Sequence, residues 1–303
     1  MDIARLELLR ELADRGSVTA VARATNRTAS AVSQQLKILE REAGVPLTER
    51  AGRGIVLTSA GKALARTATD VAIAIARAEA LWEDFRSQPR GEVTLAIFPT
   101  GGQMLLPGLL GAVESLPGLS LTCRDLDGVV TDLGDLTSNF DIVVADAPGI
   151  LPTWTQRRLT VVPLMREPLD VALPVGHPLG RKSVLTPADL INETWIGTLS
   201  MLPFDRILRS IEAVNGSPAH IAQRFIDNGI VESLVAAGRG IGILPRFTTR
   251  GRENGLISRP LSGVRASRLI SALMRPDRAE RPSVRAVVEA LQAEAARVEL
   301  ANA

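Results

Sequence analysis

The start of the chain has the hydrophobic periodicity of helices. Residues 3–14 carry an apolar side chain at every third position, and Gly16 is a typical helix end. Ser17 is a favourable N-cap for a second, shorter helix over 18–25, and Thr28 is a favourable N-cap for a third. Two short helices joined by a tight turn are the pattern of a helix-turn-helix.

The third predicted helix, residues 28–40, has two faces of different character. Its apolar positions step by three and four residues and are expected to pack inward: Ala29, Val32, Leu36 and Leu39. Its other face carries hydrogen-bonding side chains without negative charge: Ser30, Ser33, Gln34 and Lys37. No Asp or Glu occurs between residues 15 and 39. An acid-free polar face over an apolar back is what the major groove of duplex DNA accepts, and an ordinary surface helix is the alternative.

A hairpin, or wing, is predicted directly after this helix. Residues 45–47 and 55–58 favour two short strands around a glycine-flanked tip, residues 50–54, which presents Arg53. Arg50 and Arg53 suit contact with phosphates or with a narrow minor groove, where the negative potential is strong.

These residues together resemble the DNA-binding domain of the LysR-type transcriptional regulators. The likeness runs without a gap through the following positions: Leu6, Ala13, Gly16, Ser17, Ala20, Ala22, Ala31, Val32, Ser33, Gln35, Leu39, Glu40, Gly44, Leu47, Arg50, Arg53, Leu57, Thr58, Ala60 and Gly61. The chain departs from the family at three places: Ala29-Ser30, where Gln-Pro is usual, Gln34, where Arg is frequent, and Thr48, where Phe is usual. The first two departures bear on which bases are read. We expect seven residues to contact DNA: Thr28, Ser30, Ser33, Gln34, Lys37, Arg50 and Arg53.

A long amphipathic helix is predicted from Ser59 to about Ser87. Its apolar positions follow a heptad pattern that only Thr67 interrupts: Leu57, Ala60, Leu64, Thr67, Val71, Ala74, Ala78, Leu81 and Phe85. A seam of this length needs a partner. The resemblance implies a linker helix that pairs two subunits, and the alternative is a helix that packs on its own chain.

Residues 88–91, Gln-Pro-Arg-Gly, end the helical pattern and mark a domain boundary. Strand-like runs follow at 93–98, 119–123, 140–145, 169–174, 194–197, 220–225, 241–244 and 267–274, and helix-like runs at 102–115, 130–138, 204–214, 229–237 and 282–298. The alternation over residues 93–145 predicts a parallel α/β sheet, and a second set of strands and helices begins near residue 164. Residues 176–179 and 235–245 resemble the LysR effector domain, which implies two lobes between which the chain crosses twice.

The expected fold is therefore α/β, with three parts. Residues 1–58 form an N-terminal winged helix-turn-helix, and residues 59–88 form a linker or dimerisation helix. Residues 91–303 form a two-lobed, periplasmic-binding-protein-like effector domain. Its lobe I would comprise residues 91–163 and 266–303, and its lobe II residues 164–265.

Small molecules in open α/β sheets bind beyond the carboxyl ends of strands, at helix N-termini. Three such places offer hydroxyls, amides and backbone N–H groups to a small effector, in particular an anion: Thr100 with Gly101 and Gly102, Thr198 with Leu199, and Asn228 with Gly229. By resemblance, Thr100 and Thr198 occupy positions where the family often holds its effector. The alternative is that Thr100, Thr198 and Asn228 only cap their own helices.

Charge and cysteine content narrow the functional class. The net charge is only +2, but residues 15–62 carry eight Lys or Arg against three Glu, whereas residues 91–303 carry 21 basic and 22 acidic side chains. A basic excess confined to the N-terminal part indicates nucleic-acid binding. The single cysteine, Cys123, excludes an intramolecular disulfide and a cysteine metal cluster, and we expect it to be a buried small residue. Acidic residues interrupt every apolar stretch near the N-terminus, so that a cytoplasmic protein without membrane association is expected.

No catalytic constellation is apparent. The glycines of residues 238–242 follow a predicted helix and precede a strand, which is the reverse of a phosphate-binding loop. His177 and His220 lack partners for a general base or a metal site, and no cofactor is expected. We expect an effector-responsive transcription factor that binds double-stranded DNA as a homodimer or homotetramer. The rival is an α/β solute-binding or enzymatic domain whose N-terminal module serves protein association.

Overall fold

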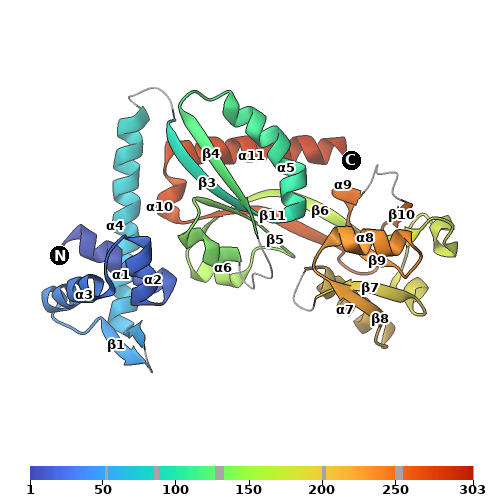
Figure 1. Cartoon of the computed structure of the whole chain (residues 1–303), viewed down its shortest axis with the longest axis horizontal. Coiled ribbons are helices and arrows are strands. Elements are labelled where there is room, and N and C mark those ends of the chain that lie inside the picture. The colour runs from blue at the N-terminus through green and yellow to red at the C-terminus, as the bar shows by residue number, and fades with distance from the viewer. Residues whose placement is uncertain (52–53, 85–88, 127–132, 200–202, 250–254, 303) are drawn as a thin grey trace.

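The computed structural model describes residues 1–51, 54–84, 89–126, 133–199, 203–249 and 255–302. Figure 1 shows a small N-terminal helical domain at one end of the molecule and a small α/β lobe at the other. A larger lobe with a twisted sheet lies between them, and a long helix, α4, connects this lobe to the N-terminal domain.

The N-terminal domain contains the predicted helix-turn-helix and wing. Its elements are α1 (Ile3–Arg15), α2 (Val18–Ala24), α3 (Ala29–Ala43), β1 (Thr48–Ala51), β2 (Gly54–Leu57) and α4 (Ser59–Asp84). Leu9, Val21, Val32 and Leu39 are fully buried in one shared core, which holds the three short helices together. With 26 residues, α4 is about 39 Å long.

Lobe I is the part of the molecule built on β3, β4 and β5. These strands, β3 (Gly91–Ile97), β4 (Leu119–Asp125) and β5 (Ile142–Ala147), are parallel, as predicted. On one face of the sheet, α5 (Pro99–Glu114) and α11 (Pro282–Ala301) pack together over a core that includes Leu95 and Leu291. On the other face, α6 (Pro152–Gln156) buries Trp154. Of the predicted helix 130–138, residues 133–138 form a short 3-10 helix, η1 (Leu133–Ser138), and residues 130–132 lie outside the described part.

Two antiparallel strands, β6 (Thr160–Pro174) and β11 (Ser267–Met274), connect the lobes. These two strands make the sheet mixed, because they carry the chain between the lobes in opposite directions. β6 begins nine residues before the predicted strand 169–174. Pro163 and Pro168 argue against a strand in its first half. Pro163 lies beside a register irregularity, however, where a strand tolerates proline. The whole sheet has the order β10-β6-β11-β5-β3-β4, with β9 also paired to β6.

Lobe II is the part built on the second half of β6. It adds β9 (Gly242–Pro245) and β10 (Leu256–Arg259) to that strand, and pairs β7 (Thr194–Thr198) in parallel with β8 (His220–Phe225). Its helices are α7 (Pro203–Asn215), α8 (Asn228–Ala236) and the short α9 (Arg246–Thr249), and two 3-10 turns, η2 (Pro178–Arg181) and η3 (Pro187–Leu190), lie before β7. Trp195 and Ile211 are buried in its core. None of the helices in the described residues is both long and apolar enough to span a bilayer.

Candidate nucleic-acid interface and interlobe cleft

The predicted polar face of α3 lies at the surface of the N-terminal domain. The Thr28 side chain caps the helix by accepting a hydrogen bond from the backbone of its first turn, and it lies 3.0 Å from the Ser30 hydroxyl. Ser30, Gln34 and Lys37 are exposed, and Ser33 is half-buried. Three of these four side chains are thus open to a partner, and no acidic residue stands among them.

The opposite face of α3 fixes how the helix sits on the domain. Val32 and Leu39 are completely buried and Leu36 is 3% exposed. Ala29, which the periodicity predicts to share this apolar stripe, is exposed. It is the first residue of the helix and lies beyond the core that the rest of the stripe contacts, so that the stripe begins one turn later than predicted.

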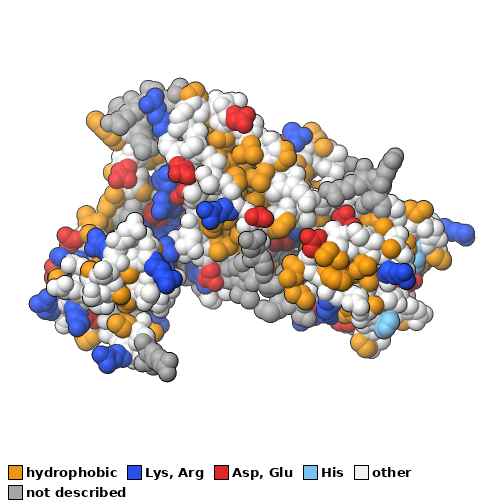
Figure 2. Space-filling model, viewed as in Figure 1, with side chains coloured by type: hydrophobic (Ala, Val, Ile, Leu, Met, Phe, Trp, Pro, Cys, Tyr) orange, Lys and Arg blue, Asp and Glu red, His pale blue; other side chains and the backbone are white. Residues whose placement is uncertain are grey.

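The wing is held to α3 by the Glu40 carboxylate. Its Oε1 accepts hydrogen bonds from the backbone N–H groups of Leu47 at 2.9 Å and Thr48 at 2.8 Å, and from the Thr48 hydroxyl at 2.9 Å. These bonds direct the negative charge of Glu40 toward the hairpin. Arg50 is exposed on β1, opposite Ile55 of β2, whereas Arg53 lies outside the described residues. Figure 2 shows several Lys and Arg side chains around the rim of this domain.

At the first predicted effector position, Thr100 is buried in the first turn of α5. The N-cap of this helix is Phe98, without a side-chain hydrogen bond, so the alternative that Thr100 caps its helix is wrong. The Thr100 hydroxyl instead accepts a hydrogen bond from Nη2 of Arg268 at 2.8 Å. Gly101 is buried against the Phe98 ring, where an added Cβ would lie 2.7 Å from a ring carbon, and Gly102 is half-buried.

The two other predicted effector positions lie in lobe II. Thr198 ends β7, is 4% exposed, and its buried hydroxyl makes no hydrogen bond to any described residue, while the half-buried Leu199 follows it. Asn228 is the first residue of α8, and Gly229 beside it is exposed. The cap of α8 is Asp227, whose carboxylate accepts from the helix backbone, so the capping alternative is wrong for Asn228 as well.

Arg268, which the sequence did not single out, fills the point where the lobes meet. Its Nε and Nη2 donate to Oε2 of Glu167 at 2.8 and 2.6 Å, and its Nη1 donates to Oδ2 of Asp146 at 3.0 Å. Arg268 is 2% exposed and Glu167 is completely buried. Burial by itself lowers the pKa of Arg268, but the attraction of Glu167 and Asp146 outweighs it and raises the pKa, so that the guanidinium stays charged.

Two aromatic rings enclose the same guanidinium. Its carbon lies 4.8 Å from the centroid of the Phe98 ring in lobe I and 5.4 Å from that of the Phe204 ring, on α7 of lobe II. Both distances are within the range of cation–π attraction. One guanidinium therefore joins side chains of both lobes.

Known proteins resemble the chain along most of its length. Residues 3–62 match the family described as bacterial regulatory helix-turn-helix protein, lysR family, and residues 86–296 match the LysR substrate binding domain. The chain belongs to the LysR family of transcriptional regulators. It is a DNA-binding transcriptional regulator with an effector-binding domain, not an enzyme, and regulators of this family form oligomers.

Individual members of the LysR family support this assignment. The transcriptional dual regulator GltC of Bacillus subtilis is 29% identical over 254 residues, which cover 82% of each chain. A full-length OxyR variant from Pseudomonas aeruginosa shares the fold with a TM-score of 0.64 at 19% identity, covering 96% of this chain and 98% of that one. Full-length CbnR in complex with its target DNA shares it with a TM-score of 0.54 at 22% identity, covering 97% and 100%.

The heptad positions of α4 divide into two groups in this LysR regulator. Leu57 is buried and Leu64 and Val71 are half-buried on the side where α4 packs against α1. Ala60 is also half-buried, and four further positions are exposed along the helix: Thr67, Ala74, Ala78 and Leu81. The last predicted position, Phe85, lies outside the described residues. Leu81 is 65% exposed. Part of the seam is thus covered by its own chain, and an apolar stripe remains at the surface.

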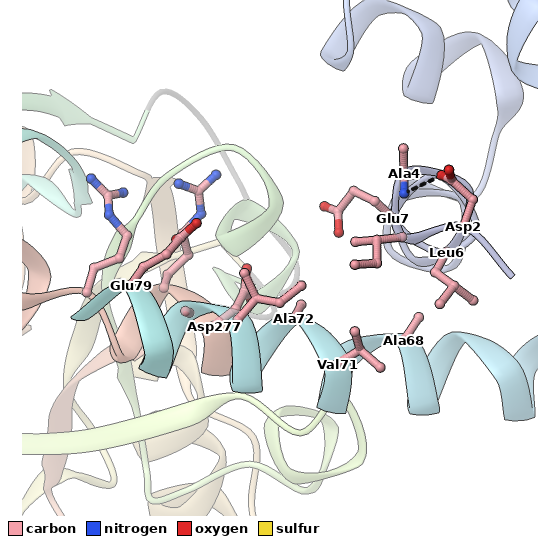
Figure 3. A pocket seen from close by; sticks show the side chains of 14 residues that line it. Asp2, Ala4, Leu6, Glu7, Ala68, Val71, Ala72, Glu79 and Asp277 are labelled. Carbon is pink, nitrogen blue, oxygen red and sulfur yellow. Dashed lines mark hydrogen bonds between the residues drawn. The ribbon is translucent and has the colours of Figure 1, made fainter. Parts of the chain in front are cut away.

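A groove of about 670 Å³ runs between α1, α4 and α10 (Pro276–Ala279). Figure 3 shows Leu6 of α1 facing Ala68 and Val71 of α4 across it. Farther along the groove, Glu79 of α4 and Asp277 of α10 replace these apolar side chains. Asp2 and Glu7 line the groove next to Leu6, so that acidic side chains lie at both ends of it.

A cluster of ion pairs, in which Arg10, Glu11 and Arg275 are buried, joins the N-terminal domain to lobe I. Nη1 of Arg275, which lies between β11 and α10, is 2.6 Å from Oε1 of Glu11 and 3.3 Å from Oδ2 of Asp14 on α1. Arg10 of α1 pairs with Asp277 at 3.0 Å. Sequence periodicity does not reveal this cluster, because Glu11 and Arg275 lie 264 residues apart.

The pKa values of the carboxyl groups in this cluster shift in different directions. Burial raises the pKa of Glu11, but attraction by Arg275 and hydrogen bonds from Arg275 and Arg15 outweigh burial and lower it. Burial likewise raises the pKa of Asp277, and attraction by Arg275 and Arg10 lowers it below its ordinary value. For Asp14, burial dominates and its pKa lies above the ordinary value.

Proposed function

We propose that α3 is the recognition helix of this LysR regulator. The observation that carries the proposal is its exposed polar face, which bears a lysine and no acid, over an apolar back in which Val32, Leu36 and Leu39 are buried. Ser30, Ser33, Gln34 and Lys37 contact base edges and phosphates in the major groove, and Thr28 orients the first turn. Arg50 and Arg53 contact the flanking backbone or minor groove.

Lys37→Ala tests this proposal. We expect the variant to weaken specific binding by about 1–3 kcal/mol if Lys37 meets a base, and to reduce the slope of log K against log[salt] by roughly 0.9 for each phosphate that the variant no longer neutralises. The measurement is fluorescence anisotropy with the DNA upstream of the regulator's own gene, at several salt concentrations. Thermal stability should not change, because Lys37 is exposed and its removal leaves the buried stripe intact.

Arg181→Ala is the matched control for Lys37→Ala. It removes one positive charge at an exposed position of lobe II, far from α3 along the molecule. Equal loss of affinity in both variants would mean that net charge and not the α3 face governs binding. Unchanged affinity and unchanged salt slope in Lys37→Ala would contradict the recognition-helix proposal directly. Ser33→Ala extends the test to a neutral side chain.

We propose that the regulator works as a homodimer or homotetramer in the cytoplasm, where chromosomal DNA lies. The exposed apolar stripe of α4 supports pairing of two linker helices, because a heptad seam is stabilised by a second helix. The proposed boundaries are a DNA-binding domain of residues 1–58, a linker of 59–88 and an effector domain of 91–303. Lobe I then comprises 91–163 and 266–303, and lobe II comprises 164–265.

We further propose that a small-molecule effector binds between the lobes. The residues that would hold it are those predicted at the helix starts: Thr100, Gly101, Gly102, Thr198, Leu199, Asn228 and Gly229. The buried hydroxyl of Thr198 has no hydrogen-bond partner among the described residues, which supports this placement because such groups usually have a partner. The formal charge of Arg268 with Glu167 and Asp146 is −1, so an anionic effector would bind nearer Thr198 than Thr100. The effector acts by binding one arrangement of the lobes better than another.

A further inference from the structure

Thr100 lies at one of the two positions that are expected to hold a free effector, and its hydroxyl is already engaged. Its Oγ1 accepts from Nη2 of Arg268 at 2.8 Å, and both side chains are buried. A ligand that donated a hydrogen bond to this hydroxyl oxygen would compete with a guanidinium that the protein itself supplies. The Arg268 guanidinium therefore occupies one acceptor position of Thr100 at the inner end of the proposed cleft.

The surroundings of Arg268 are complementary to a planar cation. Carboxylate oxygens of Glu167 and Asp146 accept from all three of its nitrogens, at 2.6 to 3.0 Å. The rings of Phe98 and Phe204 contribute their π faces to the same cation. Charged donors matched by carboxylates, together with aromatic faces, are the arrangement that recognises a guanidinium in particular.

The position of these groups makes Arg268 a bridge between the lobes. Phe98 directly precedes α5 of lobe I, whereas Phe204 belongs to the first turn of α7 in lobe II. Glu167 and Arg268 lie on β6 and β11, where the two connecting strands pair with each other. Withdrawal of the guanidinium would leave the completely buried Glu167 carboxylate without its charge partner, which is strongly unfavourable.

We propose that the interlobe cleft contains a guanidinium-binding site, and that this chain fills the site itself with Arg268 as a tethered ligand that holds the lobes together. The inference rests on the proposed effector cleft, because it identifies what occupies that cleft at its Thr100 end. Lobe closure is then set by the chain, and the DNA footprint of the unmodified protein is that of the closed arrangement without any added ligand.

Arg268→Ala with ethylguanidinium chloride tests the proposal on the full-length protein. Alanine keeps Cβ, and ethylguanidinium supplies the two carbons and the guanidinium that the substitution removes. We expect Arg268→Ala to lower the melting temperature by on the order of 10 °C, and millimolar ethylguanidinium to recover much of that loss. Ethylammonium, which lacks the planar fork, and urea, which lacks the charge, should not recover it, and none of the three should stabilise the wild-type protein.

The footprint on DNA separates a tethered ligand from ordinary core packing. We expect Arg268→Ala to change the length of the protected DNA or to change affinity about tenfold, and ethylguanidinium to restore both. Absence of thermal recovery in a folded Arg268→Ala protein would overturn the proposal. Recovery of stability while the footprint never departs from that of the wild type would also overturn it, because Arg268 would then serve only packing.

Phe204→Leu keeps the test decisive if Arg268→Ala does not fold. It removes the lobe II ring but keeps every ion pair of Arg268, so we expect a small loss of stability with an altered footprint. An unaltered footprint in a folded Phe204→Leu protein would count against the bridge. Binding of ethylguanidinium to Arg268→Ala can be measured by calorimetry without DNA. Failure of the recognition-helix proposal would appear as absent DNA binding by the wild type. The two failures are therefore distinguishable.

Discussion

The polar face of α3 and the surroundings of Arg268 are both rich in hydrogen-bonding groups, but they differ in how far those groups are satisfied. Gln34 and Lys37 on α3 are exposed and keep their hydration. Arg268 and Glu167 are buried and matched to each other within hydrogen-bonding distance. An exposed polar group can wait for a partner in water, whereas a buried charge is stable only when it is already paired.

This difference indicates where each end of the regulator meets something external. The α3 face is shaped by its buried back and by the Glu40 tether of the wing, so it is formed before DNA arrives. In the proposed interlobe site, Arg268 donates a hydrogen bond to Thr100, and the Thr198 hydroxyl has no hydrogen-bond partner among the described residues. We therefore expect the DNA-binding end to be preorganised and open, and the proposed sensing end to be preorganised and occupied by Arg268 beside Thr100.

Glu167→Ala removes a partner of the buried Arg268 and should have the largest effect on the free energy of unfolding. It leaves the buried guanidinium of Arg268 with Asp146 as its only remaining carboxylate among the residues that the structure describes, and we expect the free energy of unfolding to fall by about 3–5 kcal/mol. Urea denaturation followed by circular dichroism measures the change. Glu289→Ala, at an exposed position of α11, is the matched control and should stay within about 0.5 kcal/mol of the wild type. A comparable loss in both variants would mean that Glu167 has no special role.

The two regions also differ in how well the sequence predicts them. The α3 face follows from local periodicity and from the Thr28 cap, both of which act within a few residues, and its only error is Ala29 at the helix start. The Arg268 site depends on contacts across 101 and 168 residues, which periodicity cannot express. A usable signal was present, since Glu167 and Arg268 are oppositely charged residues at the edges of apolar strand-like runs. Such residues are usually paired when they are buried.

The predicted fold class is confirmed, and the errors in single elements have similar causes. The parallel strands of lobe I are predictable because each strand is followed by its own helical run, but the antiparallel connection of β6 and β11 depends on how the chain returns from lobe II. The cap of α8 was missed by one residue, since Asp227 and Asn228 are both good caps and only the three-dimensional structure decides between them. The ion pairs of Arg275 with α1 could not be predicted, because they form only after two separate domains meet.

Acidification should destabilise the ion-pair junction between the N-terminal domain and lobe I, with an effect of intermediate size on the free energy of unfolding. Glu11 has a lowered pKa, so its stabilising contribution is complete above the ordinary glutamate pKa and is lost as the pH falls through the lower value of the folded state. Asp14 has a raised pKa, so its protonation favours the folded state and precedes that loss. We expect Glu11→Gln to cost about 1–3 kcal/mol at neutral pH and to flatten the acid limb of the stability curve.

Urea denaturation at a series of pH values measures this prediction. Asp14→Asn is the matched control on the same helix, because it removes a carboxyl group whose pKa shift has the opposite sign. The acidic and basic groups that face Glu11 at the junction are the following: Glu7, Arg10, Asp14, Arg15, Arg275 and Asp277. If Glu11→Gln keeps the full acid sensitivity of the wild type, the ion pair with Arg275 does not stabilise the junction.

Thr198→Val should give the smallest effect on stability and the sharpest information on the sensing end. The buried Thr198 hydroxyl makes no hydrogen bond to the described residues, so replacing it with a methyl group of similar shape should change the free energy of unfolding by less than about 1 kcal/mol, in either direction. A thermal-shift screen of small carboxylates against wild type and Thr198→Val then tests whether this hydroxyl binds an effector. A compound that stabilises the wild type but not the variant would place the ligand at Thr198, whereas a compound that stabilises both equally would place it elsewhere. A polar group without a partner is ordinary at a hydrated surface such as the polar face of α3, but in a buried site its desolvation is offset only when something binds it.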